Sequence, residues 1–188
     1  MHYAARSGSV GCLRALRRAG ADMAARTKFG WTAAHVAANH SQPAALAALL
    51  RCGCPSEAGD FVGWTPLHLA TLRLGEGTNG CECRRCTKLQ ERRVQCVRQL
   101  LRAGASTAAR DSRGATPGHL AAAQDDGEAL RLLRTVSRTD LWLPDDDGIR
   151  PLDIARGRRS SSSFVKALLM LTDSLQPQPL ALGGIEHA

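Results

Sequence analysis

Hydrophobic residues along the chain are grouped in short clusters with helical spacing, and they do not alternate with polar residues as in a β-strand. Such clusters place apolar side chains on one face of a helix. Glycine follows two of them, at Gly53 and Gly104, where it favours a helix end because it tolerates left-handed backbone. The pattern therefore predicts short amphipathic helices, whose apolar positions include Leu46, Leu49 and Leu50; Val97, Leu100 and Leu101; Leu130, Leu132 and Leu133; and Val165, Leu168 and Leu169.

The glycine and polar positions recur at a fixed distance. A step of 33 residues relates His2, His35 and His68, and the pairs Gly20 and Gly53, Gly30 and Gly63, and Thr32 and Thr65. The next equivalents come 51 residues later, and they are Gly104, Gly114, Thr116 and His119. The step from Gly114 to Gly148 is 34 residues. The sequence therefore predicts a series of repeats, one of which carries an insertion of about 18 residues.

The best preserved unit contains Thr65-Pro66-Leu67-His68-Leu69-Ala70. It resembles the ankyrin repeat, whose signature is Thr-Pro-Leu-His-x-Ala and whose period is about 33 residues. Segments 30–38 and 114–122 carry the same pattern with Ala33 and Gly118 as departures, and 148–155 has lost both Thr and His. The resemblance implies an all-α solenoid of helix-turn-helix repeats joined by β-hairpin-like loops.

The markers also predict where each repeat lies. The first repeat lacks its leading loop, so we expect its N-terminus to fray or the native chain to be longer. The predicted boundaries are 1–26 for the partial first repeat, 27–58 for the second, 59–110 for a third with a Cys/Arg-rich insertion at about 75–93, 111–141 for the fourth, 142–172 for a degenerate C-terminal capping repeat, and 173–188 for a disordered tail.

The recurring polar residues have a structural interpretation. Thr before Pro favours a helix start, because the hydroxyl accepts a free backbone N–H and proline has none to lose. The resemblance implies that each His bonds the backbone of a neighbouring repeat. Since no nucleophile, base and orienting group remain, the sequence predicts a protein that is not an enzyme. The structural residues are Thr32, His35, Thr65, Pro66, Leu67, His68, Thr116, Pro117 and His119.

Composition narrows the class of protein further. Apolar residues make up 44 % of the chain and aromatic residues 4 %, and the net charge is +8. No apolar run is long enough to cross a membrane, and the N-terminus has no hydrophobic signal segment. The seven cysteines are then expected to be reduced thiols. These features predict a cytoplasmic or nuclear protein without a cofactor.

The insertion near 75–93 admits three interpretations. Its glycines spell Gly-x-Gly-x-x-Gly, but no strand precedes them, so we expect a flexible loop. Four cysteines would suit a tetrahedral zinc ion, although one Cys-x-x-Cys pair is a weak pattern against a mobile reduced loop: Cys81, Cys83, Cys86 and Cys96. Basic residues would form a lip for an acidic partner, or simply a solvated loop: Arg84, Arg85, Lys88, Arg92 and Arg93.

The resemblance also implies where a partner would bind. Ankyrin arrays recognise proteins through the loop tips and the exposed side of the first helices. Four of the seven aromatic residues lie on two adjacent tips, and aromatic residues beside basic ones are typical of binding hot spots. Trp31 and Trp64 would alternatively pack against neighbouring loops. The predicted contact residues are Lys28, Phe29, Trp31, Asn39, His40, Phe61, Val62, Trp64, Arg73 and Arg113.

The leading functional hypothesis is a monomeric scaffold or adaptor that binds a protein partner. One alternative is a nuclear regulator with charge-driven association with nucleic acid, although the arginines are scattered over helix faces without stacking aromatics. A second alternative is a substrate receptor of a ubiquitin ligase, provided that the native chain is longer. Ser161 follows Arg158 and Arg159 and matches a basic-directed phosphorylation site.

Overall fold

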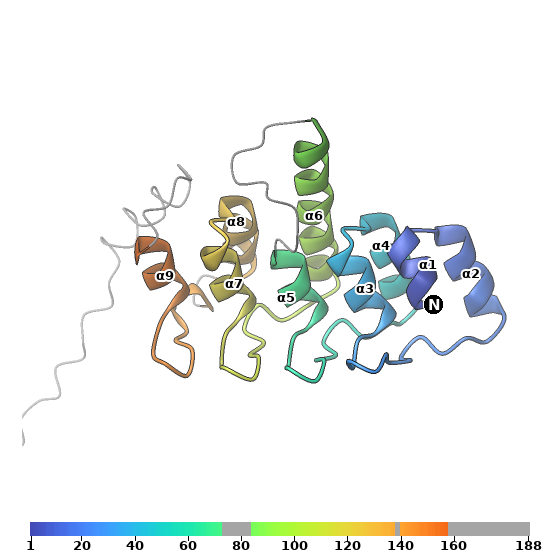
Figure 1. Ribbon diagram of the computed structural model, residues 1–188, viewed down its shortest axis with the longest axis horizontal. Helices are drawn as coiled ribbons and strands as arrows, with labels where there is room; N and C mark the ends of the chain where they lie inside the picture. The colour runs from blue at the N-terminus through green and yellow to red at the C-terminus, as the bar shows by residue number, and fades with distance from the viewer. Residues whose placement is uncertain (73–83, 138–139, 158–188) are drawn as a thin grey trace, which may run out of the picture.

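The computed structural model describes residues 1–72, 84–137 and 140–157, and this part of the chain is helical without strands. Successive pairs of helices follow one another along the molecule, and the loops that join the pairs lie on one side of it (Figure 1). The α-helices are α1 (His2–Ser7), α2 (Val10–Arg18), α3 (Ala33–Asn39), α4 (Pro43–Arg51), α5 (Pro66–Thr71), α6 (Arg84–Arg102), α7 (Pro117–Ala123), α8 (Gly127–Val136) and α9 (Pro151–Gly157), with a short 3-10 helix, η1 (Asp140–Trp142), before α9.

The helices form two rows. In the first row α1, α3, α5, α7 and α9 pack against one another in succession, and in the second row α2, α4, α6 and α8 do the same. The rows meet within each pair, where α3 contacts α4 and α7 contacts α8. Small and branched apolar side chains such as Ala37, Leu46 and Leu100 are fully buried between them. Because each helix is short, the contacts between repeats supply the stability.

The helices α3, α5 and α7 begin with the same capping arrangement. Thr32, Thr65 and Thr116 are their N-cap residues, and each forms a capping box with the histidine three positions later. At α3 the N–H of Thr32 donates to Nδ1 of His35 over 3.0 Å. A neutral imidazole whose Nδ1 accepts carries its proton on Nε2. This Nε2 donates to the carbonyl oxygen of Trp64 in the next repeat over 2.9 Å.

The bond from Nε2 to the following repeat recurs along the first row, and we call the series the histidine latch. Burial lowers the pKa of His35 and of His68, so both imidazoles are neutral at pH 7. Each latch fixes the start of one helix to the loop of the following repeat. Its other members are His2 with Trp31 O at 3.0 Å, His68 with Ala115 O at 3.2 Å and His119 with Ile149 O at 2.9 Å.

The helix α6 contains part of the predicted insertion. It has 19 residues, whereas α4 has nine, and it extends beyond its neighbours on the side away from the loops (Figure 1). The interpretation of 75–93 as a loop is therefore wrong for residues 84–93, which are helical. Residues 73–83 lie outside the described part of the chain. None of the described helices is long and apolar enough to cross a membrane.

Candidate functional site

The tip loops, at residues 27–31, 60–64, 111–115 and 145–149, are all closed in one way. In the second loop the N–H of Asp60 donates to the carbonyl oxygen of Trp64 over 2.9 Å. Oδ1 of Asp60 in turn accepts the N–H groups of Val62 and Trp64, each at 2.9 Å. Gly63 has φ +84°, and a Cβ there would meet the Asp111 backbone at 3.0 Å. Glycine is thus required where successive loops approach.

Backbone hydrogen bonds also join each described tip loop to the next one. These bonds make the four loops a continuous edge, whose shape is set by the main chain and not by the surface side chains. The donors and acceptors are Phe61 N with Phe29 O at 3.4 Å, Ser112 N with Val62 O at 2.8 Å, and Asp146 N with Arg113 O at 3.1 Å.

Two tryptophans tie three consecutive repeats together. The carbonyl oxygen of Trp31 accepts the latch of His2, while its indole Nε1 donates to Oδ2 of Asp60 over 2.9 Å. Trp64 does the same one repeat later, with His35 on one side and Asp111 on the other, at 3.0 Å from its Nε1. Both rings are half-buried and pack against the core. The structure therefore gives both tryptophans a structural role, and partner contact by them stays a prediction.

The sequence analysis missed the part that aspartates play in this arrangement. Burial alone would raise the pKa of Asp111, but hydrogen bonds from the Arg113 N–H and the Trp64 indole outweigh it, so the pKa is lowered. Asp60 and Asp111 are 51 residues apart, and Asp111 and Asp145 are 34 apart. These are the offsets of the glycines that mark the repeats. The periodicity that identified the histidines therefore also carried a signal for the aspartates.

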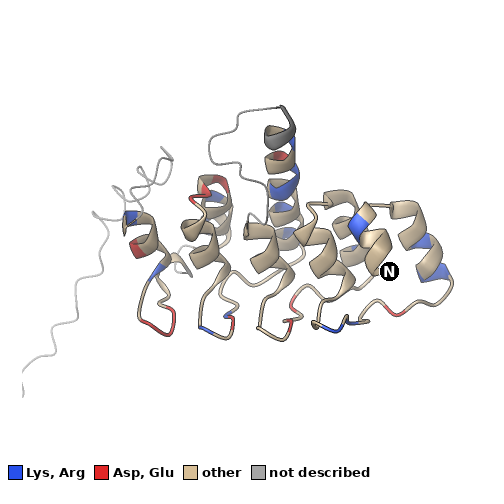
Figure 2. Ribbon diagram, viewed as in Figure 1, with Lys and Arg blue, Asp and Glu red and all other residues tan. Residues whose placement is uncertain are grey.

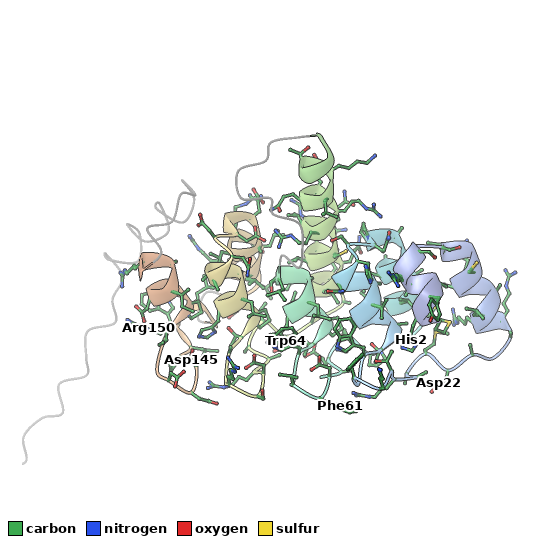
Figure 3. All side chains as sticks on the ribbon, in the orientation of Figure 1. His2, Asp22, Phe61, Trp64, Asp145 and Arg150 are labelled. Carbon is green, nitrogen blue, oxygen red and sulfur yellow. The ribbon has the colours of Figure 1, made fainter. Side chains whose placement is uncertain are left out.

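The exposed apolar side chains of the first two tip loops are Phe29, Phe61 and Val62, which we call the tip patch, and Ile149 is exposed separately on the fourth loop. The exposed fractions of Phe29, Phe61 and Val62 are 61 %, 76 % and 48 %. The ring of Phe61 lies against Gly30 of the preceding loop, where an added Cβ would meet its Cδ1 at 3.1 Å. Figure 3 labels Phe61 at the free edge of the loops, with Trp64 nearer the helices. The patch is therefore outside the packed core and available for contact.

Basic groups border the tip patch. Nζ of Lys28 lies 5.1 Å from the centroid of the Phe29 ring, a cation–π distance. Arg113 is exposed on the third loop, next to Ser112, which bonds to the carbonyl oxygen of Val62. The structure thus brings Lys28, Phe29, Phe61, Val62 and Arg113 onto one edge.

The remaining predicted contact residues lie elsewhere. Asn39 and His40 are at the C-terminal end of α3, about 10 Å along the helix from its start at the tip side. His40 is exposed, and partial burial together with the charge of Arg6 lowers its pKa. Asn39 is half-buried, with Oδ1 unpaired. Arg73 lies outside the described residues. Asn39 and His40 thus lie at the end of α3 that is farther from the tip patch.

The basic lip predicted from the insertion is wrong for Arg93. Its side chain is only 7 % exposed and forms an ion pair with Asp126, which is 1 % exposed. Arg93 also donates to the carbonyl oxygen of Thr71 over 3.3 Å and to Gln90 over 3.0 Å. Asp126 in turn caps α8 by accepting the N–H of Ala129. Arg93 is therefore a structural residue that joins α5, α6 and α8.

The other basic residues of the predicted lip have different surroundings. Arg92 donates to Oε1 of Gln42, in the turn before α4. Lys88 is exposed near the start of α6. The side chains of Arg84 and Arg85 lie outside the description. Only Lys88 is thus placed by the structure as a free surface cation of this lip.

Of the four cysteines of the predicted cluster, the side chain of Cys96 lies in the described part of the chain. Cys96 is fully buried in α6, and burial raises the pKa of its thiol to about 12. A buried protonated thiol is a core residue and a poor metal ligand. Cys81, Cys83 and the side chain of Cys86 lie outside the described residues, as do Ser161 and the tail from 173 on. Among the described residues no three metal-binding side chains converge.

Comparison with known families gives two matches. The family described as "Ankyrin repeats (3 copies)" matches residues 1–81, and that described as "Ankyrin repeat" matches residues 62–112. Together they cover residues 1–112, more than half of the chain. With the helical architecture described above, these matches confirm the predicted all-α repeat solenoid. No curated protein matches the chain.

Proposed function

This chain belongs to the ankyrin-repeat family, and we propose that it is a non-catalytic scaffold or adaptor that binds a protein through its tip patch. Ankyrin repeats are generally protein–protein interaction modules and typically have no catalytic activity. The observation that carries the proposal is the exposure of Phe29 and Phe61 on adjacent loops, in a chain with only 4 % aromatic residues. The concave, exposed side of the first-row helices, which the family resemblance implies as a binding surface, would extend the tip patch.

The rigidity of the tip edge supports this function. Backbone bonds between loops and the two Trp–Asp links hold the base of each loop in place. A partner then meets a preformed surface, and little conformational entropy is lost when it binds. Lys28 and Arg113 supply a polar border to the apolar centre, the arrangement found in protein interfaces.

The test compares two variants that each lose exposed apolar side chains, one within the tip patch and one outside it. Phe29→Ala/Phe61→Ala removes the two exposed rings, and Val136→Ala removes an exposed apolar side chain of α8, in the second row. Partners captured by the unaltered chain are identified by mass spectrometry, purified and titrated against each variant. We expect the double variant to bind at least about tenfold more weakly and the control to bind as the unaltered chain does. Equal affinity of all three proteins would overturn the proposal.

A further inference from the structure

Arginines end three successive helices of the second row at the same position of the repeat. Arg18, Arg51 and Arg102 are separated by 33 and 51 residues, the offsets of the repeat itself. They lie in the last turns of α2, α4 and α6. A cation there interacts favourably with the negative end of the helix dipole. The same placement sets a series of positive charges along the second row, one for each repeat.

Two hollows open between these helix ends. The one between α2 and α4 has a volume of about 390 Å³, and the one between α4 and α6 about 530 Å³. Arg51 lines both hollows, so they form one surface that we call the arginine groove. Its arginines are Arg14, Arg17, Arg18, Arg51 and Arg102, and the walls between them include Ala47, Ala48, Leu50, Cys52 and Ala103.

The helices that carry the arginine groove contain almost no acidic residues to offset its positive charge. Neither α2 nor α4 contains an acidic residue, and α6 contains only Glu91. None of the five groove arginines forms an ion pair with a described residue, whereas Arg93, Arg110, Arg131, Arg150 and Arg156 all do. Figure 2 shows basic segments on α2 and α6, and acidic segments on the upper part of α6, on α8 and α9 and in the loops. An uncompensated groove of one sign attracts ligands of the opposite sign.

We propose that the arginine groove binds an extended acidic segment of a partner protein, which crosses the ends of α2, α4 and α6. Packed helices lie about 10 Å apart, and an extended peptide in the polyproline II conformation advances about 9 Å in one turn of three residues, which returns every third side chain to the same face. A peptide with an acidic residue at every third position would therefore meet Arg18, Arg51 and Arg102 in turn. Guanidinium groups bind carboxylates in pairs of hydrogen bonds. The residues between the acidic ones would pack on the alanine and leucine side chains of the hollows.

The chemistry of the walls favours a peptide over a single strand of nucleic acid. Strands of nucleic acid are held by aromatic rings on which bases stack. Of the described residues that line the two hollows, none is aromatic. Small apolar walls suit aliphatic side chains instead. The groove belongs to the second row, so this binding is separate from that of the tip patch.

The probe is a fluorescent synthetic peptide with Glu at every third position and Pro and Val between, which favours the polyproline II conformation, and binding is measured by fluorescence anisotropy at about 0.15 M salt. The test variant is Arg18→Gln/Arg51→Gln/Arg102→Gln. The matched control, Arg6→Gln/Arg131→Gln/Arg156→Gln, removes the same charge from residues outside the groove. Circular dichroism establishes that both variants are folded. We expect the test variant to bind the peptide at least about tenfold more weakly and the control less than about threefold.

Three outcomes would overturn the proposal. Equal weakening in both variants would mean that net charge alone attracts the peptide. Lack of binding by the unaltered chain at peptide concentrations up to about 1 mM would mean that the groove has no useful affinity. Tighter binding of a thymidine oligonucleotide of equal charge, sensitive to the same three arginines, would assign the groove to nucleic acid.

Discussion

Two of the polar contacts that join the repeats of this molecule differ in kind. Along the first row, neutral histidines such as His35 and His68 each give one hydrogen bond to the following loop, and the arrangement recurs. At the junction of α5, α6 and α8, the buried ion pair of Arg93 and Asp126 occurs once. A neutral bond costs little to bury, whereas a charged pair is stable only when every partner is present. The histidine latch can therefore recur at little energetic cost, whereas the ion pair of Arg93 and Asp126 is sensitive to the loss of either partner.

The largest effect should come from breaking the singular contact. Arg93→Met keeps an apolar stem but leaves the carboxylate of Asp126 buried without its cation. We expect a loss of about 3–5 kcal/mol in the free energy of unfolding, measured by urea denaturation with circular dichroism. The double variant Arg93→Met/Asp126→Asn removes both charges and keeps an N-cap for α8, so it should recover much of the loss. If the double variant is no more stable than Arg93→Met, the unpaired charge is not the cause.

Acid should lower the stability of the protein by an intermediate amount, through the histidine latch. Burial lowers the pKa of His35 and His68 below 6.5, against opposing contributions from Asp60 and Asp111. Below pH 6.5 these two histidines become protonated in the unfolded chain but stay neutral in the folded protein. Acid therefore favours the unfolded chain, and the free energy of unfolding falls as the pH decreases. The measurement is the free energy of unfolding at pH values between about 7.5 and 5.

A variant without these two titrating groups provides the control for the acid effect. In His35→Gln/His68→Gln the side chain can still close a capping box but does not titrate. The pH dependence should then shrink, even though the protein is less stable throughout. His40, whose pKa is also lowered, is left unchanged and accounts for any small remainder. An undiminished slope would show that other groups carry the acid sensitivity.

The smallest effect should come from one tryptophan link. Trp31→Phe keeps an aromatic ring in the half-buried site but removes the bond from Nε1 to Asp60. We expect a loss of about 1.5 kcal/mol in the free energy of unfolding, because one hydrogen bond from a neutral donor to a carboxylate is lost. Phe61→Leu, at a ring that is 76 % exposed, is the matched change on the surface and should alter stability much less. A larger loss from Phe61→Leu would reverse the assignment of these two rings.

The sequence alone predicts most of the features that recur from repeat to repeat. The family, the helical class and the series of helix starts follow from marks such as Thr65, Pro66 and His68, because each repeat must solve the same packing problem with the same residues. The role of Asp60 and Asp111 was present in the same offsets and was overlooked. The tip residues Phe29 and Phe61 were predicted as exposed partner contacts from their position, and the structure places them at the exposed edge.

The sequence did not suffice where a contact occurs once. Arg93 occupies the buried face of α6, together with Cys96, Val97 and Leu100, at a place where a hydrophobic residue would have continued the helical pattern. The arginine interrupted that pattern, so residues 84–93 were taken for a loop. Its partner Asp126 lies 33 residues away on another helix, and no local signal connects the two. The arginine groove was overlooked although Arg18, Arg51 and Arg102 recur at the offsets of the repeat, because only the stacking of the helices shows that they line one surface.

The latch between His68 and Ala115 spans 47 residues, whereas the equivalent bond from His35 spans 29, and the two bonds are nearly the same length. The contact between the third and fourth repeats is thus kept, although the third repeat carries a longer segment between its two helices. The connection between α5 and α6 would therefore accept additional sequence, such as a second recognition module or a reporter peptide, without a change in the contacts between the flanking repeats. A related protein could gain a new binding segment at this connection while its stacked repeats kept their geometry.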